Sequence, residues 1–64
     1  MGFKFKLFEA IRKADMYQRD FAKIVGEPES KVSLVVNGKY NLNQAERIKW
    51  ARVLGQPQEE LFGE

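Results

Sequence analysis

Turn-forming residues divide this 64-residue chain into short segments, and this division constrains the fold more than any other feature. Gly26, Gly38 and Gly55 each follow a segment in which apolar residues recur at three- or four-residue spacing, the pattern of a helix with one buried face. Glycine readily adopts the left-handed backbone that ends a helix. The Val-Val-Asn-Gly segment at 35–38 would also suit a hairpin, but no alternating strand follows it. We therefore predict an all-α fold of five short helices.

The predicted helices cover about residues 4–14, 18–25, 29–36, 44–54 and 58–62 of a single domain formed by residues 1–64. Each helix has an apolar stripe that we expect to face a common core. The expected inward residues are Phe3, Leu7, Ala10, Ile11 and Ala14 in the first helix, Phe21, Ala22 and Val25 in the second, Val32, Val35 and Val36 in the third, Ile48, Ala51 and Leu54 in the fourth, and Leu61 and Phe62 in the last. Trp50 lies at the edge of the fourth stripe, and we expect it to pack on that helix.

Polar residues at the ends of these segments have the chemistry of helix caps. Asp15 is a short turn residue that ends the first helix. Pro28 suits the first position of the third helix, and Glu29 after it favours the positive end of the helix dipole. Asn43 and Glu46 have the spacing of a capping box, which predicts a hydrogen-bonded start for the fourth helix.

The composition argues against an enzyme. The chain has no cysteine and no histidine, so it lacks thiolate and imidazole metal ligands and the commonest general base. We assign no catalytic residue, metal or cofactor, and no small-molecule ligand is indicated. The 44% hydrophobic and 31% charged content is typical of a globular domain. No apolar run is long enough to span a membrane, and no secretory signal is evident, so we expect a cytoplasmic protein.

Charge is unevenly distributed along the chain. Residues 1–52 contain all 11 lysines and arginines against six acidic residues, a net charge of +5. Residues 53–64 contain Glu59, Glu60 and Glu64 and no basic residue, a net charge of −3. A basic body with an acidic end is compatible with a nucleic-acid face directed away from the C-terminus. An ordinary mixed-charge surface explains the same charges equally well.

The stretch of residues 18–37 has the spacing of two helices joined by a tight turn. Ala22 is a small residue where two crossed helices would approach, and Gly26 accepts the positive φ of the turn between them. Val32 and Val35 would bury the inner face of the second helix. Its opposite face would then be exposed, and an exposed helix of this kind fits the major groove of DNA.

Further segments extend this pattern into a resemblance to a known family. The Tyr17-Gln18 pair, the Asn-Gly-Lys segment at 37–39 and the C-terminal residues 51–62 together resemble the Cro and phage-repressor (XRE-like) type of helix-turn-helix protein. The resemblance covers about residues 6–62. It implies a lambda-repressor-like DNA-binding domain with the helix-turn-helix at about residues 18–37.

The resemblance also implies two sets of DNA contacts. The first set would bind backbone phosphates and consists of Tyr17, Gln18, Asn37, Lys39 and Gln44. In the family, the segment after the recognition helix uses both side chains and backbone N–H groups for this purpose. The second set would read bases from the helix at about residues 29–36 and consists of Glu29, Ser30, Lys31, Ser33 and Leu34. Glu29 either accepts a hydrogen bond from a cytosine amine or only stabilises the start of the helix.

The sequence departs from the family pattern at several positions. Tyr17 replaces the usual Ser or Thr and caps a helix poorly, so we expect Asp15 to share the capping. Glu27 occupies a usually apolar position in the turn. Ile11 and Val36 replace an Arg and a Glu that form a partly buried ion pair in many members. Because an apolar pair can substitute for a buried ion pair, we hypothesise that Ile11 and Val36 touch.

These observations favour a sequence-specific, DNA-binding transcriptional regulator of the phage-repressor type. Its expected partner is double-stranded DNA, bound as a weak homodimer that forms on the DNA. The alternative is a protein-interaction module on a helix-turn-helix scaffold that has lost DNA binding. Acidic residues near the recognition helix favour this alternative, as do Phe3, Phe5 and Phe8, which exceed what one small helix can bury.

Overall fold

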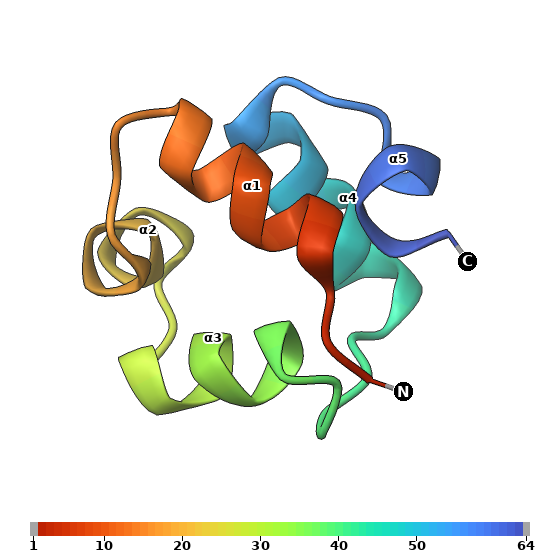
Figure 1. The fold of residues 1–64 in the computed structure, drawn as a ribbon, viewed down its shortest axis with the longest axis horizontal. Helices are drawn as coiled ribbons and strands as arrows, with labels where there is room; N and C mark the ends of the chain where they lie inside the picture. Colours follow the sequence, from red (N-terminus) through yellow and green to blue (C-terminus); the bar gives the residue numbers. More distant parts are fainter. Residues whose placement is uncertain (1, 64) are drawn as a thin grey trace.

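The structure is a computed structural model that describes residues 2–63 and contains five α-helices and no strand in that range (Figure 1). The helices are α1 (Phe5–Lys13), α2 (Gln18–Val25), α3 (Glu29–Val36), α4 (Gln44–Leu54) and α5 (Gln58–Phe62). The predicted bounds of the last four are confirmed, and α1 begins and ends one residue inside its predicted range. Glu64, one of the three acidic residues at the C-terminal end, lies outside the described residues.

The helices surround one core in a body of 25 × 22 × 21 Å. Figure 1 shows α1 running across the middle of the molecule, with α2 beside one end of it and α5 beside the other. α3 lies along one side of the body, and α4 lies behind α1 in this view. α2 packs against α3, and α5 packs against both α1 and α4, so helices from both ends of the chain share the core.

Trp50 is fully buried and occupies the centre of the core rather than its edge. Its ring makes an edge-on contact with Phe21, with 5.1 Å between ring centroids, and a tilted contact with Phe62 at 6.4 Å. The predicted inward position of Ile48 is wrong, because 40% of this residue is exposed. α4 is therefore rotated from the predicted orientation so that the largest side chain, rather than the isoleucine, fills the space between α2 and α5.

The buried face of α1 is narrower than predicted. Leu7, Ala10 and Ile11 are buried as predicted, but Ala14 is exposed and Phe3 is 47% exposed. Ala14 follows the last residue of α1, where the chain has already turned away from the core. Leu42, in the loop before α4, is also buried, although the sequence did not indicate it.

Ile11 and Val36 are both buried in the same core, with 0% and 1% of their surfaces exposed. α1 and α3, which carry them, are in contact. Neither residue lies in solvent, and the hypothesis that their side chains touch stays a prediction. Two apolar residues at these positions avoid the cost of taking charges out of water.

An N-terminal arm, residues 2–4, lies along the turn that follows α3 (Figure 1). The Lys4 backbone N–H donates to the Val36 carbonyl oxygen at 2.7 Å. Gly2 approaches Gly38 so closely that a Cβ on Gly38 would collide with the Gly2 carbonyl group. Gly38 also has a positive φ of 74°, so both its space and its backbone conformation exclude a side chain.

The helix caps agree with the sequence at some ends and differ at others. Asn43 and Glu46 form the predicted capping box, with Glu46 N–H donating to Asn43 Oδ1 at 2.8 Å. Asp15 ends the α1 segment with a positive φ of 64°, but it does not cap α2. Asp20 caps α2 instead, because its carboxylate accepts the Tyr17 N–H at 3.0 Å. Pro28 precedes α3 as its N-cap residue rather than occupying its first position.

No helix in residues 2–63 is long and apolar enough to cross a membrane. The same range contains no group of acidic side chains arranged to hold a metal ion.

Candidate nucleic-acid interface

α2, the turn and α3 form a unit in which two crossed helices meet at small residues. In Figure 1, α2 is seen nearly end-on whereas α3 runs across the view. Ala22 is buried at the approach of the two helices, and Gly26 has the left-handed φ of 75° that the turn requires. The Glu27 N–H donates back to the Ala22 carbonyl oxygen at 2.9 Å, which satisfies the end of α2. Val32 and Val35 are buried as predicted.

The opposite side of α3 faces solvent, as the spacing predicted. Glu29 and Ser30 are exposed at its start, and Leu34 is 43% exposed one turn later. Ser33 is only partly exposed, and its carbonyl oxygen and hydroxyl accept the side-chain amide of Asn37. Three of the five residues predicted to read bases are therefore fully presented on the surface of α3, and Ser33 is engaged by its own helix end.

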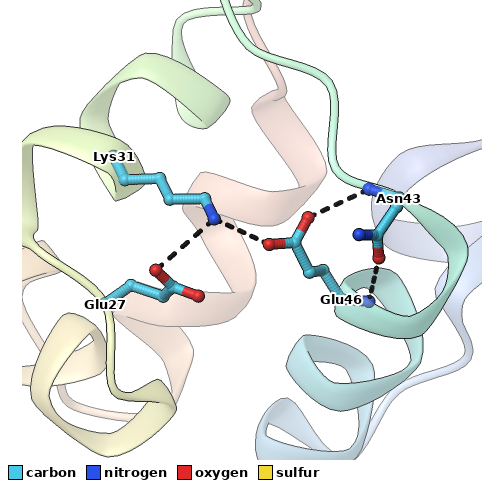
Figure 2. A network of polar contacts seen from close by, with 4 residues as sticks. All are labelled: Glu27, Lys31, Asn43 and Glu46. Atoms are coloured by element: carbon cyan, nitrogen blue, oxygen red, sulfur yellow. Dashed lines mark hydrogen bonds and ion pairs between the residues drawn. The ribbon is translucent and has the colours of Figure 1, made fainter.

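Lys31 differs from the predicted role, because its ammonium group is held between two carboxylates (Figure 2). Its Nζ lies 2.6 Å from Oε2 of Glu46 on α4 and 3.4 Å from Oε1 of Glu27 in the turn. Only 19% of the Lys31 side chain is exposed. The hydrogen bond to Glu46 raises the pKa of Lys31, and the same bond, with that from the Asn43 backbone, lowers the pKa of Glu46.

This network ties α3 to the start of α4. Glu46 accepts both Lys31 and the Asn43 N–H, the latter at 3.0 Å, so a single carboxylate joins the ion pair to the capping box. The Lys31 ammonium also lies 5.2 Å from the centre of the Tyr40 ring. Lys31 is thus a residue that positions α3, and its predicted contact with bases stays a prediction. Glu27, an unexpected acid in the turn, has a partner in Lys31.

The residues at the start of α2 line a surface groove. Tyr17 is 57% exposed and Gln18 is partly buried. The groove has a volume of about 390 Å³ and is lined by Phe8, Arg12, Tyr17, Gln18, Arg19 and Glu29. It brings Gln18, a predicted phosphate contact, next to Glu29 at the start of α3. The starts of the two helices therefore open onto one surface, as a shared DNA contact would require.

The segment after α3 presents side chains but not backbone donors. Asn37 and Lys39 are exposed as predicted. However, the backbone N–H groups of residues 37–39 donate to the Ser33, Val35 and Leu34 carbonyl oxygens at 2.9, 3.0 and 2.8 Å. The expectation that these N–H groups bind phosphate is therefore wrong for this conformation, since they complete the end of α3. Contacts from this segment would come from the side chains alone.

Gln44 is exposed in the first turn of α4, beside the Asn43–Glu46 capping box. The Lys31–Glu46 ion pair connects this helix start to α3. The residues predicted to bind phosphate therefore come from the start of α2, the end of α3 and the start of α4. Arg12 and Arg19 lie beside the Tyr17 ring, and the sequence did not indicate these contacts. Arg12 is separated from Tyr17 by a non-helical turn, so no periodic pattern could indicate their contact.

Comparison with known proteins finds no protein-family model, curated protein or solved structure that matches this chain.

Proposed function

We propose that this chain is a sequence-specific, DNA-binding transcriptional regulator with a lambda-repressor-like fold, in which α3 lies in the major groove. One observation carries the proposal. Glu29, Ser30 and Leu34 are exposed on the outer face of α3, and that helix is held from its inner face by Val32 and Val35. A rigid helix with an exposed face has the dimensions that the major groove accepts, and its first residues reach base edges.

The flanking residues supply the contacts that hold such a helix in place. Gln18 lies beside the start of α3. Asn37 and Lys39 are exposed after its end, and the Asn37 side-chain amide folds back to donate to Ser33. Most hydrogen bonds between proteins and DNA go to phosphates and sugars, and these fix the register of the reading helix. In this proposal, Gln18, Asn37, Lys39 and Gln44 position the domain, whereas Glu29, Ser30 and Leu34 discriminate among sequences.

One domain of this size reads only a few base pairs. We infer that two copies bind a palindromic site about one helical turn apart, and that they associate weakly and mainly on DNA. A regulator of this kind would act in the cytoplasm, where bacterial and phage DNA is found.

A protein-interaction module is the second candidate, and the exposed aromatic residues near the N-terminus favour it. Phe3 is 47% exposed and Phe5 is 66% exposed, and their rings pack edge-on with 5.4 Å between centroids. Contiguous exposed apolar surface often marks a protein contact. Glu27 also favours this candidate, because the Lys31 ammonium that lies 3.4 Å from it is shared with Glu46 at 2.6 Å, which leaves the three groups with a net negative charge.

Binding affinity measured as a function of salt separates the two candidates. A fluorescently labelled random duplex is titrated with wild type and single variants at several salt concentrations. Lys39→Ala should weaken binding to every duplex and reduce the salt slope by about one unit. Ser30→Ala and Leu34→Ala should leave the slope unchanged and alter which duplexes a random library yields.

Lys13→Ala serves as the matched control, because it removes one exposed positive charge on the side of α1 that faces α5. This variant should bind as wild type does. Failure of wild type to bind any duplex at low salt would exclude DNA binding and leave the interaction module. Equal effects of Lys39→Ala and Ser30→Ala would show that the division between positioning and reading residues is wrong.

A further inference from the structure

Tyr17 holds two arginine side chains at the start of α2. The Arg12 guanidinium carbon lies 4.9 Å from the centre of the Tyr17 ring, and that of Arg19 lies 5.5 Å from it. Arg12 comes from the last turn of α1 and Arg19 from the first turn of α2, so the ring collects charge from two helices. Both arginines are exposed, and neither forms an ion pair with a carboxylate in residues 2–63.

The two guanidinium groups line the 390 Å³ groove that also contains Gln18 and Glu29. Glu29 is the one acidic residue in this lining, against two arginines. The groove therefore carries a net positive charge, and its positive groups are not already neutralised by neighbours. By contrast, the Lys31 ammonium has two carboxylate partners. An anion entering the molecule's surface at this point meets unpaired guanidinium donors.

Arginine is suited to a phosphate ligand for two reasons. Its planar fork of N–H groups matches two phosphate oxygens at once, and its face stacks on an aromatic ring. A guanidinium already held over a ring loses less side-chain freedom when it binds. The Tyr17 ring thus prepares both arginines for a planar, bidentate contact without itself touching the ligand.

We propose that Arg12 and Arg19 form a binding site for a backbone phosphate of DNA, and that Tyr17 is a positioning residue that holds them. This inference rests on the proposed function, since the groove adjoins Gln18 and the start of α3. It changes the role of Tyr17, whose ring organises the site while its hydroxyl is dispensable. It also adds two phosphate-binding residues that extend the positioning contacts from α2 onto α1.

The test compares the salt dependence of DNA binding for the double variant Arg12→Ala/Arg19→Ala with that of Lys13→Ala. Loss of one phosphate contact should lower the salt slope by about one unit and, by the same relation, reduce affinity roughly eightfold at 0.1 M salt. Lys13→Ala removes a positive charge next to Arg12 in sequence, but Lys13 lines a different groove. This variant should leave the salt slope and the affinity nearly unchanged. All substituted positions are exposed, so circular dichroism should show an unchanged fold.

Two substitutions of Tyr17 test its positioning role. Tyr17→Phe keeps the ring and should bind DNA as wild type does. Tyr17→Leu removes the ring and should weaken binding about fivefold, the size of two weak cation–π contacts, while both charges and the salt slope remain. Equal losses in the two variants would assign the phosphate contact to the hydroxyl and overturn the positioning role.

The outcomes separate this inference from the proposed function. If wild type binds DNA and the double variant behaves as Lys13→Ala does, the arginine site is wrong and the proposed function stands. If wild type binds no duplex, both fail. A titration with inorganic phosphate alone tests whether the site binds the free phosphate ion rather than a phosphate of DNA. Saturation of the Arg12 and Arg19 side-chain NMR signals at millimolar phosphate would assign the site to the free ion and overturn the DNA assignment.

Discussion

The contact between Gly2 and Gly38 makes Gly38→Ala the most informative single substitution for the fold. Gly26 and Gly38 have nearly the same positive φ, 75° and 74°. A Cβ on Gly26 would meet nothing within 4 Å, whereas a Cβ on Gly38 would collide with the Gly2 backbone. The same chemical change at the two positions therefore imposes the same backbone strain, but only the change at Gly38 displaces the N-terminal arm.

The structure sets the expected magnitudes. Placing alanine in the left-handed region costs about 1–2 kcal/mol, and this is the whole expected effect of Gly26→Ala. Gly38→Ala also breaks the hydrogen bond from the Lys4 N–H to the Val36 carbonyl oxygen, worth about 1 kcal/mol. The free energy of unfolding should thus fall by about 1 kcal/mol more for Gly38→Ala. In a domain of this size, that difference lowers Tm by about 4–8 °C.

Thermal unfolding followed by circular dichroism measures the difference, and amide hydrogen exchange locates it. The Lys4 amide should lose its protection in Gly38→Ala and keep it in Gly26→Ala. Amides in the centre of α1 should remain protected in both variants, which shows that only the arm is released. Equal Tm values for the two variants, together with a protected Lys4 amide, would refute the assigned contact between the arm and the turn.

Three further predictions concern charge and the core. Lys31 and the Asn43 backbone hold the pKa of Glu46 below the usual 4.5, so the stabilising contribution of Glu46 is full above that pH and is lost as the pH falls through the lowered pKa. The Tm difference between wild type and Glu46→Gln should therefore shrink as the pH falls below 4.5, and a constant difference would contradict the pairing with Lys31. Each of the substitutions Ile11→Arg and Val36→Glu should lower the free energy of unfolding by about 3–5 kcal/mol, because it buries an unpaired charge. The double variant should lose less free energy of unfolding than the two single variants together, and strict additivity in a double-mutant cycle would contradict the proximity of the two residues. Trp50→Ala should lower the free energy of unfolding by about 3–5 kcal/mol. A cooperative urea transition that stays near the wild-type midpoint would place Trp50 outside the core.

Local chemistry explains why the helix bounds could be predicted. Gly26 and Gly55 end α2 and α4 in the left-handed conformation, and the Asn43–Glu46 capping box starts α4. These signals act within three or four residues, so they operate before any tertiary contact forms. The same holds for Val32 and Val35, whose spacing alone gives one buried side of α3.

The orientation of α4 could not be predicted in the same way. Ile48 with Ala51 and Trp50 with Leu54 are both compatible with helical spacing, and nothing local chooses between them. Phe21 and Phe62, from helices on either side, provide the aromatic surfaces that draw Trp50 inward. Residues distant in sequence thus determine which face of α4 is buried, so the apolar spacing along α4 alone does not predict it.

In the candidate site, too, some features follow from the local sequence and others depend on contacts between helices. Exposure of Ser30 and Leu34 follows from the buried positions of α3, and it was predicted. The engagement of the Lys31 ammonium depends on Glu46, 15 residues away on another helix. The contact of Arg12 with Tyr17 crosses an irregular turn. Ion pairs and ring contacts between elements depend on the tertiary arrangement, which spacing along the chain does not specify.

Mapping of backbone amide shifts by NMR tests the proposal that the exposed face of α3 and its flanking side chains bind DNA. The labelled protein is titrated with a random duplex at low salt, and salt is then raised. We expect shifts at Gln18, Ser30, Asn37 and Lys39 that diminish as salt rises, because phosphate contacts release counterions. Unchanged spectra at low salt, or shifts confined to the region of Phe3 and Phe5, would exclude DNA binding by this face of α3.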